Sequence, residues 1–452
     1  MRRRKVQRKP AETLRRDFSS LGWPVLLVLC TALVLGGGGS RYGILNLAVQ
    51  MVALGLLCWF HANARHSARS LGFGIAALVS VTIALPLLQL IPLPAGLWQG
   101  MPGRELATES RGIIGVENGW FPLSLDRGRT ITAFASLIPP LAILLLLRAP
   151  DGERGFSQAG LRLLVMLALA NLLLGAFQIA TGGVSPLPYP IIDDSRSYGF
   201  FANHNSSGLF SVIALCALAG VRFSEHGVVS PRAARFLLGA LLVIATVLTQ
   251  SRSSTALLLL PLGFFAFRWF LAERSSMTRK KVIGAAIGLG AVALLGGYLL
   301  SETRMSATFD RFENLEDARP DLWRDGLVSA ERFFPVGSGM GTFDEVYQLD
   351  ESLETLTPAF ARRAHNDYIE IAVEAGVLGL AIVIAWFIWG SVAWLRALGS
   401  GRNLEGAAAG LALLCIALQS GVDYPLRNQA LLCVAALLVA MLARPMVKSR
   451  VR

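Results

Sequence analysis

Long apolar segments, separated by shorter polar ones, dominate the chain. Each apolar segment is close to the ~20 residues that a helix needs to cross the hydrocarbon core of a bilayer. The pattern therefore predicts an all-α integral membrane protein with about twelve transmembrane helices. These predicted spans lie at residues 21–38, 44–60, 71–94, 129–147, 160–180, 207–222, 236–250, 254–272, 282–300, 373–395, 406–421 and 429–443.

The polar connections between the spans are of two kinds. Short, basic connections alternate along the chain with longer ones of mixed charge, at 95–127, 181–206 and 301–372. A connection as long as the last is usually a binding element or a lid when it is ordered. We therefore expect one integral domain in which the 301–372 segment carries function between the membrane helices of 1–300 and those of 373–452.

The 301–372 segment has a hydrophobic pattern of its own. Apolar side chains recur near helical spacing in its middle part, at Leu322, Trp323, Leu327, Val328 and Phe333. Pro320 fits an early position of this helix, and the glycine-rich sequence PVGSGMGTF ends it. We expect a second helix to begin near Pro358 and to continue through His365 into the next span.

Composition supports the membrane interpretation and locates the charge. The chain is 54% hydrophobic and only 16% charged, whereas soluble proteins carry roughly 25% charged residues. The formal net charge is +12, but the basic residues gather at alternate ends of the spans, and every lysine lies there, at positions 5, 9, 280, 281 and 448. Basic residues favour the cytoplasmic side of a membrane. We therefore expect both termini in the cytoplasm and no nucleic-acid partner.

Several kinds of chemistry lack their usual sequence patterns. The five cysteines lie within predicted spans and form no C-x-x-C pair, so neither a zinc site nor a disulfide framework is indicated. The GxxxxGK[ST] phosphate loop is absent, and the nearest outward acidic pair, Asp193–Asp194, is a weak metal signal. Few ionisable groups fall within the spans, which argues against an ion-coupled transporter. We expect no metal and no cofactor.

The sequence RRAHNDYIE ends the 301–372 segment and is its densest polar cluster. In a helix, Arg363 would pair with Asp367, four residues later. Arg362 would pair with Asn366 at the same spacing. Histidine is the usual proton acceptor when a hydroxyl becomes a nucleophile, which makes His365 a candidate base. The alternative interpretation is a solvated helix start with an incidental histidine.

Three further arginines are candidates for anion binding, because a guanidinium suits phosphate oxygens. Arg252 lies in the sequence QSRSS between two spans, where it could also be a snorkelling side chain that marks the interface. Arg319 lies one helical turn before Trp323, which could be a membrane anchor or a sugar-stacking surface. Arg196 lies in the 181–206 connection.

Two more motifs leave a functional and a structural interpretation open. In FFANHNSSG, His204 lies between two asparagines, and the polar residues after it could simply cap the following helix. In GVDYPLRNQ, Asp423 and Arg427 could only be a pair across a tight turn.

These motifs resemble those of the O-antigen ligase and O-antigen polymerase superfamily of bacterial envelope glycosyltransferases. The resemblance rests on FFANHNSSG, SRSS, ARPDLW, PVGSGMGTF and, most specifically, RAHNDYIEIAVEAGVLGL, which follow one another in the family's order over roughly residues 195–430. The N-terminal third of the chain resembles the family in hydropathy alone.

The resemblance implies a GT-C-like fold and a metal-independent, inverting glycosyltransferase. Such an enzyme takes a glycan from an undecaprenyl-diphosphate carrier on the periplasmic face of the bacterial inner membrane. The acceptor hydroxyl belongs to lipid A–core for a ligase and to a growing glycan for a polymerase. His365 matches the family's essential loop histidine, Arg252 the arginine of its SR turn, and Arg319 the arginine before its loop tryptophan.

The resemblance therefore gives His365 the role of catalytic base and gives Arg252 and Arg319 the diphosphate. Either Arg362 or Arg363 could take the part of Arg319. The rest of the expected substrate site comprises Arg196, Arg363, His204, Asn366 and Trp323. The His-Asn signature favours a ligase over an O-antigen or exopolysaccharide polymerase of the same family, some of whose members glycosylate proteins instead. From other classes, a transporter or flippase of a lipid-linked anion and a structural scaffold for envelope assembly stay open, and membrane lipids surround the protein in every case.

Overall fold

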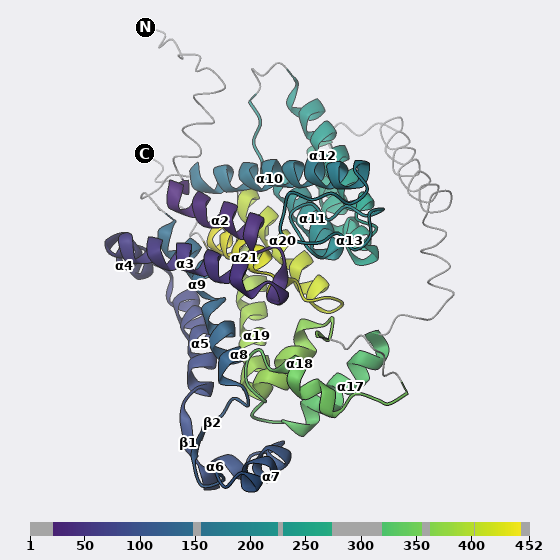
Figure 1. The fold of residues 1–452 in the computed structure, drawn as a ribbon. Helices are drawn as coiled ribbons and strands as arrows, with labels where there is room; N and C mark the ends of the chain where they lie inside the picture. Colours follow the sequence, from purple (N-terminus) through teal and green to yellow (C-terminus); the bar gives the residue numbers. More distant parts are fainter. Residues whose placement is uncertain are drawn as a thin grey trace.

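The computed structural model describes residues 21–147, 155–224, 229–273, 319–354, 362–401 and 403–443. Helices dominate these residues (Figure 1), as expected for an all-α membrane protein. Five helical segments are long and apolar enough to cross a membrane, or up to six if one bent pair counts as a single span, and shorter apolar helices accompany them. Every predicted span overlaps an apolar helix except the one at 282–300, which lies outside the described residues. The number of twelve transmembrane helices remains a prediction.

The N-terminal helices follow one another with short connections. They are α2 (Trp23–Leu35), α3 (Gly43–Trp59), α4 (His61–Ser70) and α5 (Phe73–Gln89), with a 3-10 turn, η1 (Gly39–Arg41), after the first. The polar helix α4 bends away from α3 by 85°. The short connection between the predicted spans at 44–60 and 71–94 is therefore itself helical.

A small module follows α5 and projects from the lower end of the molecule in Figure 1. Its elements are β1 (Pro92–Pro94), α6 (Ala95–Gln99), α7 (Glu105–Ile113) and β2 (Trp120–Pro122). The two strands pair antiparallel, with Leu93 opposite Phe121. Strands of three residues show no alternation that a sequence pattern can detect, so this hairpin was not predicted.

The next group of helices makes up the middle of the chain. They are α8 (Arg127–Ala135), α9 (Ile138–Leu146), α10 (Gly155–Ala180), α11 (His204–Gly220), α12 (Pro231–Leu248), α13 (Arg252–Leu257) and α14 (Leu259–Glu273). Every residue of α11 from Asn205 to Gly220 is buried. A helix that is apolar on all sides belongs in the core, and α11 packs against α10, α12 and α20.

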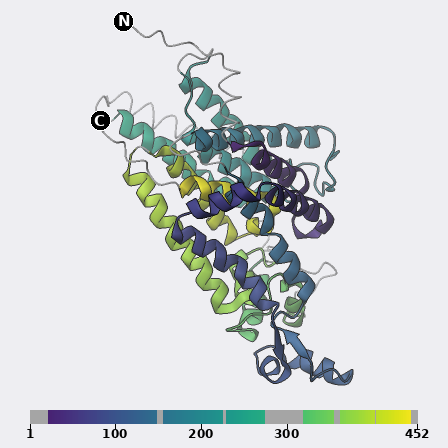
Figure 2. The same ribbon diagram turned by 90° about the vertical axis from the view of Figure 1, so that its left-hand side faces the viewer.

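The C-terminal elements are α19 (Asp367–Gly399), α20 (Leu404–Ser420), η4 (Pro425–Arg427) and α21 (Gln429–Leu442). Buried alanines at 407, 408 and 409 in α20 let neighbouring backbones approach closely. Figure 2 shows α19 as the long lime-coloured helix along one edge of the molecule. It contains a break at Gly376, where φ is 53° and ψ is −141°.

The segment between α14 and α19 contains α17 (Arg319–Arg332), α18 (Phe343–Val346) and the 3-10 turn η3 (Tyr347–Leu349). The helix predicted from the apolar pattern is confirmed as α17. Leu322, Trp323 and Phe333 pack in a separate hydrophobic cluster, whereas Leu327 and Val328 are exposed.

The second helix expected in this segment is wrong for its described part. Residues 362–366 are not helical, and α19 begins at Asp367. The side chain of Asn366 accepts hydrogen bonds from the backbone N–H groups of Tyr368 and Ile369. Asparagine is among the strongest N-capping residues, so the helix starts directly after the cluster that the sequence pattern placed inside it.

The glycine-rich sequence after α17 docks into the break of α19. Ser338 N–H donates to the Val373 carbonyl, and Gly339 N–H donates to the Glu374 carbonyl, both at 2.9 Å. These carbonyls are available because the break at Gly376 interrupts the helical ladder. The sequence PVGSGMGTF therefore fixes the α17–α18 segment to the membrane helix that begins just after His365.

Candidate functional site

His365 lies in the non-helical residues just before α19. Its Nδ1 is 3.2 Å from Oδ1 of Asp423, in the turn between α20 and η4. A carboxylate can only accept a hydrogen bond, so the ring donates from Nδ1 and Nε2 carries the lone pair. The imidazole also packs edge-on against Tyr424 at 4.9 Å between centroids, and the side chain is 34% exposed. A histidine held in this way can accept a proton at Nε2.

Asp423 is almost fully buried and accepts a second hydrogen bond, from Asn203 Nδ2 at 3.2 Å. Burial opposes its ionisation, but the hydrogen bond and charge of His365, together with the charge of Arg319, lower the pKa of this carboxyl below its ordinary value. Arg319 is therefore close enough to act on the His365–Asp423 pair. The pairing of Asp423 with Arg427 that the sequence allowed is wrong, because Arg427 contacts α19 instead.

Two motif residues have an unusual backbone conformation. Among the described residues, His365 and Gln250 are the non-glycine residues with positive φ, at 49° and 52°. Such conformations are strained for side-chain-bearing residues and concentrate at functional sites. Gln250 precedes the SRSS turn, and its Nε2 donates to the Ser195 carbonyl at 3.0 Å.

The SRSS turn packs directly against the start of α11. Ser251 caps α13, so Arg252 is its first residue and lies partly buried. Ser254 Oγ donates to the Asn205 carbonyl at 3.2 Å. A Cβ on Gly208 would lie 2.7 Å from the Ser254 side chain, so this close approach requires glycine. The FFANHNSSG and SRSS motifs therefore form one structural unit.

His204 connects this unit to Arg196. Its Nδ1 lies 2.9 Å from the Thr249 carbonyl, which can only accept, so Nε2 accepts from Arg196 Nη1 at 3.2 Å. Arg196 Nε also lies 2.9 Å from Oδ2 of Asp193. Both ring nitrogens of His204 are thus engaged, and its geometry suits positioning of Arg196 rather than proton transfer.

A buried charge network lies beneath His365 at the start of α19. Its members are Arg363, Asp367, Glu370, Glu374 and Arg427. Glu370 contacts Arg363 at 2.9 Å and Arg427 at 3.3 Å, and it accepts the Ala364 N–H at 3.0 Å. Arg363 therefore pairs with Glu370 and not with Asp367, because the helix starts too late for the expected spacing of four residues.

Burial works against the charge of Arg427, but Glu374, Glu370 and Asp367 raise its pKa above the ordinary value. Two arginines among three carboxylates fix the backbone around His365, since Glu370 holds both residues that precede the histidine. Glu370, Arg427 and Asn203 were not assigned to the site from sequence. The partners of Arg427 and Asn203 come from distant segments, and Asp367 rather than Glu370 has the helical spacing to Arg363.

Trp323 and Asn366 hold the backbone on either side of His365. Trp323 Nε1 donates to the Ala364 carbonyl at 2.9 Å, and Asn366 Nδ2 donates to the Gly421 carbonyl at 3.0 Å. Asn366 also caps α19. The indole N–H and the amide are therefore used within the protein, while the partly exposed Trp323 ring lies one turn from Arg319.

An apolar cavity of about 390 Å³ lies beside the SRSS turn, between α13, α14 and the end of α20. It is lined by Ser253, Ala256, Leu257, Leu259, Leu260, Leu418, Gln419 and Val422. Gln419 Nε2 donates to Ser253 Oγ at 2.9 Å across it. Arg252 and Asp423 are the sequence neighbours of two lining residues, Ser253 and Val422, so the cavity lies close to the polar site.

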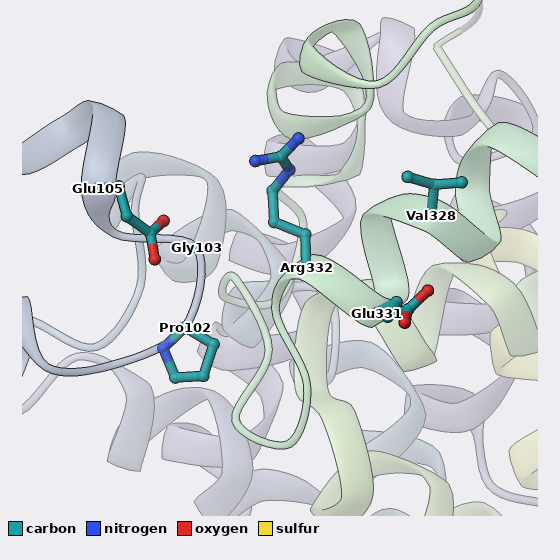
Figure 3. A pocket seen from close by; sticks show the side chains of 6 residues that line it. All are labelled: Pro102, Gly103, Glu105, Val328, Glu331 and Arg332. Atoms are coloured by element: carbon teal, nitrogen blue, oxygen red, sulfur yellow. The ribbon is translucent and has the colours of Figure 1, made fainter.

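A second cavity of about 400 Å³ lies at the far end of α17 from Arg319. Figure 3 shows Pro102 and Glu105 of the hairpin module on one side and Val328, Glu331 and Arg332 of α17 on the other. It contains none of the residues predicted for the site.

Comparison with known families identifies one region of the chain. Residues 237–384 match the family described as O-antigen ligase. Arg252, Arg319 and His365 lie within this match, and Asp423 lies beyond its end. No curated protein matches the chain significantly. The match confirms the predicted resemblance to the O-antigen ligase and polymerase superfamily.

Proposed function

We propose that this membrane protein, whose residues 237–384 carry an O-antigen ligase family region, is an O-antigen ligase. It takes a finished glycan from undecaprenyl diphosphate on the periplasmic face of the bacterial inner membrane and joins it to a hydroxyl of lipid A–core. The family match supports a transferase of the ligase or polymerase type. The observation that carries the proposal is the 3.2 Å contact between His365 Nδ1 and Asp423, which leaves Nε2 as a proton acceptor.

The proposed reaction is a single displacement at the anomeric carbon. The acceptor hydroxyl gives its proton to His365 Nε2 as its oxygen attacks C1 of the donor sugar. The bond between C1 and the phosphate oxygen breaks, its electron pair leaves with undecaprenyl diphosphate, and the anomeric centre inverts. Asp423 holds the imidazole in the required tautomer and stabilises the imidazolium that forms.

Arginine side chains stabilise the negative charge of the leaving diphosphate. Arg252 and Arg319 contact it, and Arg196, held by His204, completes the set. A diphosphate is already a stable leaving group, so the proposal needs no metal. Trp323, Arg363 and Asn366 position the backbone around His365, and the exposed part of the Trp323 ring faces the sugar.

The apolar cavity suits the isoprenoid end of the carrier. Six of its lining side chains are aliphatic, and it adjoins Arg252 through Ser253. A lipid lying there would place its diphosphate at the start of α13 while its chain continues into the membrane.

The test uses a strain that lacks the gene, complemented with wild type, His365→Ala, His365→Gln or Arg252→Ala at matched membrane levels. The exposed His66→Gln and Arg65→Ala, both on α4, are the matched controls. Surface polysaccharide and the lipid-linked glycan pool are measured together. The proposal expects the site variants to lose long surface glycan while full-length glycan accumulates on its carrier.

Other outcomes assign other functions. Accumulation of single repeat units on the carrier identifies a polymerase. Normal surface glycan with His365→Gln, combined with loss in Arg252→Ala, indicates a transporter of a lipid-linked anion. Normal glycan in all site variants overturns the catalytic assignment.

A further inference from the structure

The C-terminal end of α11, opposite the end that carries His204, is surrounded by basic side chains. Four consecutive backbone carbonyls there each accept a hydrogen bond from a side chain of another helix. The donors and acceptors are Arg268 to Ala219 at 2.6 Å, Gln158 to Gly220 at 2.9 Å, Arg235 to Val221 at 3.0 Å and Arg162 to Arg222 at 2.8 Å. Because neighbouring carbonyls share one helix end, the arginine heads from α10, α12 and α14 are crowded together.

Among the residues that the structure describes, the positive charge of this cluster exceeds the negative charge around it. Arg222 pairs with Glu405 at 2.8 Å, but within the described part of the chain neither Arg235 nor Arg268 forms an ion pair with a carboxylate. The two guanidinium charges repel each other. Arg235 Nε is also buried without a hydrogen-bond partner. Each guanidinium has five N–H donors, so both have donors left after the carbonyl bond.

Capping of the helix end accounts for part of this arrangement. The negative end of the helix dipole favours cations, and its last carbonyls need donors. However, those carbonyls are neutral groups and do not neutralise two adjacent half-buried charges. An uncompensated charge at the edge of a membrane is costly, which points to an anion as the missing partner.

The surroundings indicate where the anion comes from. Phe236 and Leu237, beside Arg235, are 80% and 57% exposed, and Trp269 and Phe270, beside Arg268, are 41% and 49% exposed. In a membrane helix, such exposed apolar and aromatic side chains face acyl chains and the interfacial region. An anion bound between Arg235 and Arg268 therefore meets lipid on its other side.

We propose that Arg235 and Arg268 bind the phosphate headgroup of an anionic phospholipid at the end of α11, on the membrane face predicted to be cytoplasmic. The planar fork of arginine suits phosphate oxygens, and basic pockets between membrane helices on this side are typical sites for anionic headgroups. This site is separate from the His365 region and does not depend on the proposed glycan transfer.

The test measures lipid binding by the purified full chain in neutral detergent micelles. Phosphatidylglycerol and phosphatidylcholine are titrated at equal mole fractions, and inorganic phosphate is added at equal total phosphate in a third arm. The readouts are native mass spectrometry of the lipid-bound fraction and the lipid-dependent shift of the thermal midpoint. Wild type is expected to bind phosphatidylglycerol in preference to both other additives.

Arg235→Gln combined with Arg268→Gln is expected to weaken phosphatidylglycerol binding by about tenfold or more. The control is Arg232→Gln, an exposed arginine on the same helix, which is expected to bind as wild type does. If that double variant does not fold, Arg235→Lys combined with Arg268→Lys keeps the charge, removes the guanidinium fork and is also expected to weaken binding.

Three results would overturn the proposal. The first is binding of phosphatidylcholine equal to that of phosphatidylglycerol. The second is equal stabilisation by inorganic phosphate alone, which identifies a free-anion site. The third is a phosphatidylglycerol affinity unchanged from wild type in whichever double variant folds.

Discussion

At the residue scale, His365 differs from the other described histidines in how its imidazole ring is held. His365 has a left-handed backbone, a buried carboxylate on Nδ1 and an aromatic ring beside it. His204, the other histidine of a conspicuous motif, has both nitrogens engaged. The sequence marked both residues equally well by their polar neighbours. Only the positions of their hydrogen-bond partners, which lie in distant segments, separate a proton acceptor from a positioning residue.

The carboxylate of Asp423 is expected to set the tautomer of His365. Its two oxygens accept from His365 Nδ1 and from Asn203 Nδ2, whereas the amide of Asp423→Asn offers one acceptor and one donor. One bond is therefore lost, or the ring turns to the tautomer whose Nε2 carries the proton. We expect kcat to fall about 10²–10⁴-fold, the range of general-base catalysis, with KM nearly unchanged.

The measurement is glycan transfer from the lipid-linked donor by purified variant and wild type. An equal loss in folded protein and in activity would mean that Asp423 is structural only. The pH profile is a second measurement. The low pKa of Asp423 keeps the wild-type carboxylate ionised near neutrality, so His365 has the required tautomer there. A wrong tautomer in Asp423→Asn would lower the rate at every pH.

At the element scale, the break in α19 is what allows the glycine-rich loop between α17 and α18 to dock. Gly376 has φ 53°, and a Cβ there would lie 2.0 Å from the Pro335 carbonyl oxygen. Its neighbours Val373 and Glu374 give their carbonyls to the glycine-rich loop. The hydropathy pattern reads α19 as one continuous span, because a break of one residue does not change the average over a window.

Gly376→Ala is expected to undock the glycine-rich loop. The backbone conformation alone costs a side-chain-bearing residue about 1–3 kcal/mol, and the clash adds to it. Gly390→Ala in the same helix is the control, since a Cβ there meets nothing within 4 Å and alanine gains up to about 1 kcal/mol over glycine in a helix. Thermal midpoints in detergent are expected to fall for Gly376→Ala and to stay level or rise for Gly390→Ala. Equal effects at the two sites would contradict a special role for the break.

The contact of α18 with α8 is expected to depend on pH. Glu345 of α18 pairs with Arg129 of α8. Burial, followed by the hydrogen bond and charge of Asp344, raises the pKa of Glu345 to about 7, against the opposing charge of Arg129. The folded protein therefore holds a proton that the unfolded chain releases near pH 4.3. This contribution to stability is present in acid and is lost as pH rises through about 7.

Glu345→Gln does not titrate, so its stability is expected to change less than that of wild type between pH 5 and pH 8. Glu109→Gln, at an exposed position of α7, is expected to follow wild type. Chemical unfolding at the two pH values measures the difference. A Glu345→Gln curve parallel to wild type would show that this carboxyl has an ordinary pKa.

At the scale of the whole molecule, the sequence predicted the elements that form within one segment and missed the side-chain pairs that form between segments. Span positions and α17 follow from hydropathy and helical spacing within single segments. The partners of His365 and Arg363 do not, because neighbours along the chain suggested Asp367 for Arg363 and Arg427 for Asp423, whereas the structure pairs Arg363 with Glu370 and His365 with Asp423. Charge networks of this kind form only when the turn after α20 meets the start of α19.

Orientation is the whole-molecule property on which the proposed chemistry depends. The positive-inside pattern predicts that α4 faces the cytoplasm and that α7 faces the periplasm. Ala62→Cys on α4 and Ser110→Cys on α7, both exposed positions, report the two sides. A membrane-impermeant maleimide applied to intact spheroplasts is expected to label Ser110→Cys at once and Ala62→Cys only after permeabilisation. Wild type measures any labelling of the native cysteines. The reverse labelling pattern would place His365 on the cytoplasmic face, opposite the face on which lipid A–core accepts the glycan in the proposed reaction. It would rule out periplasmic ligation, although the His365–Asp423 geometry would be unaffected.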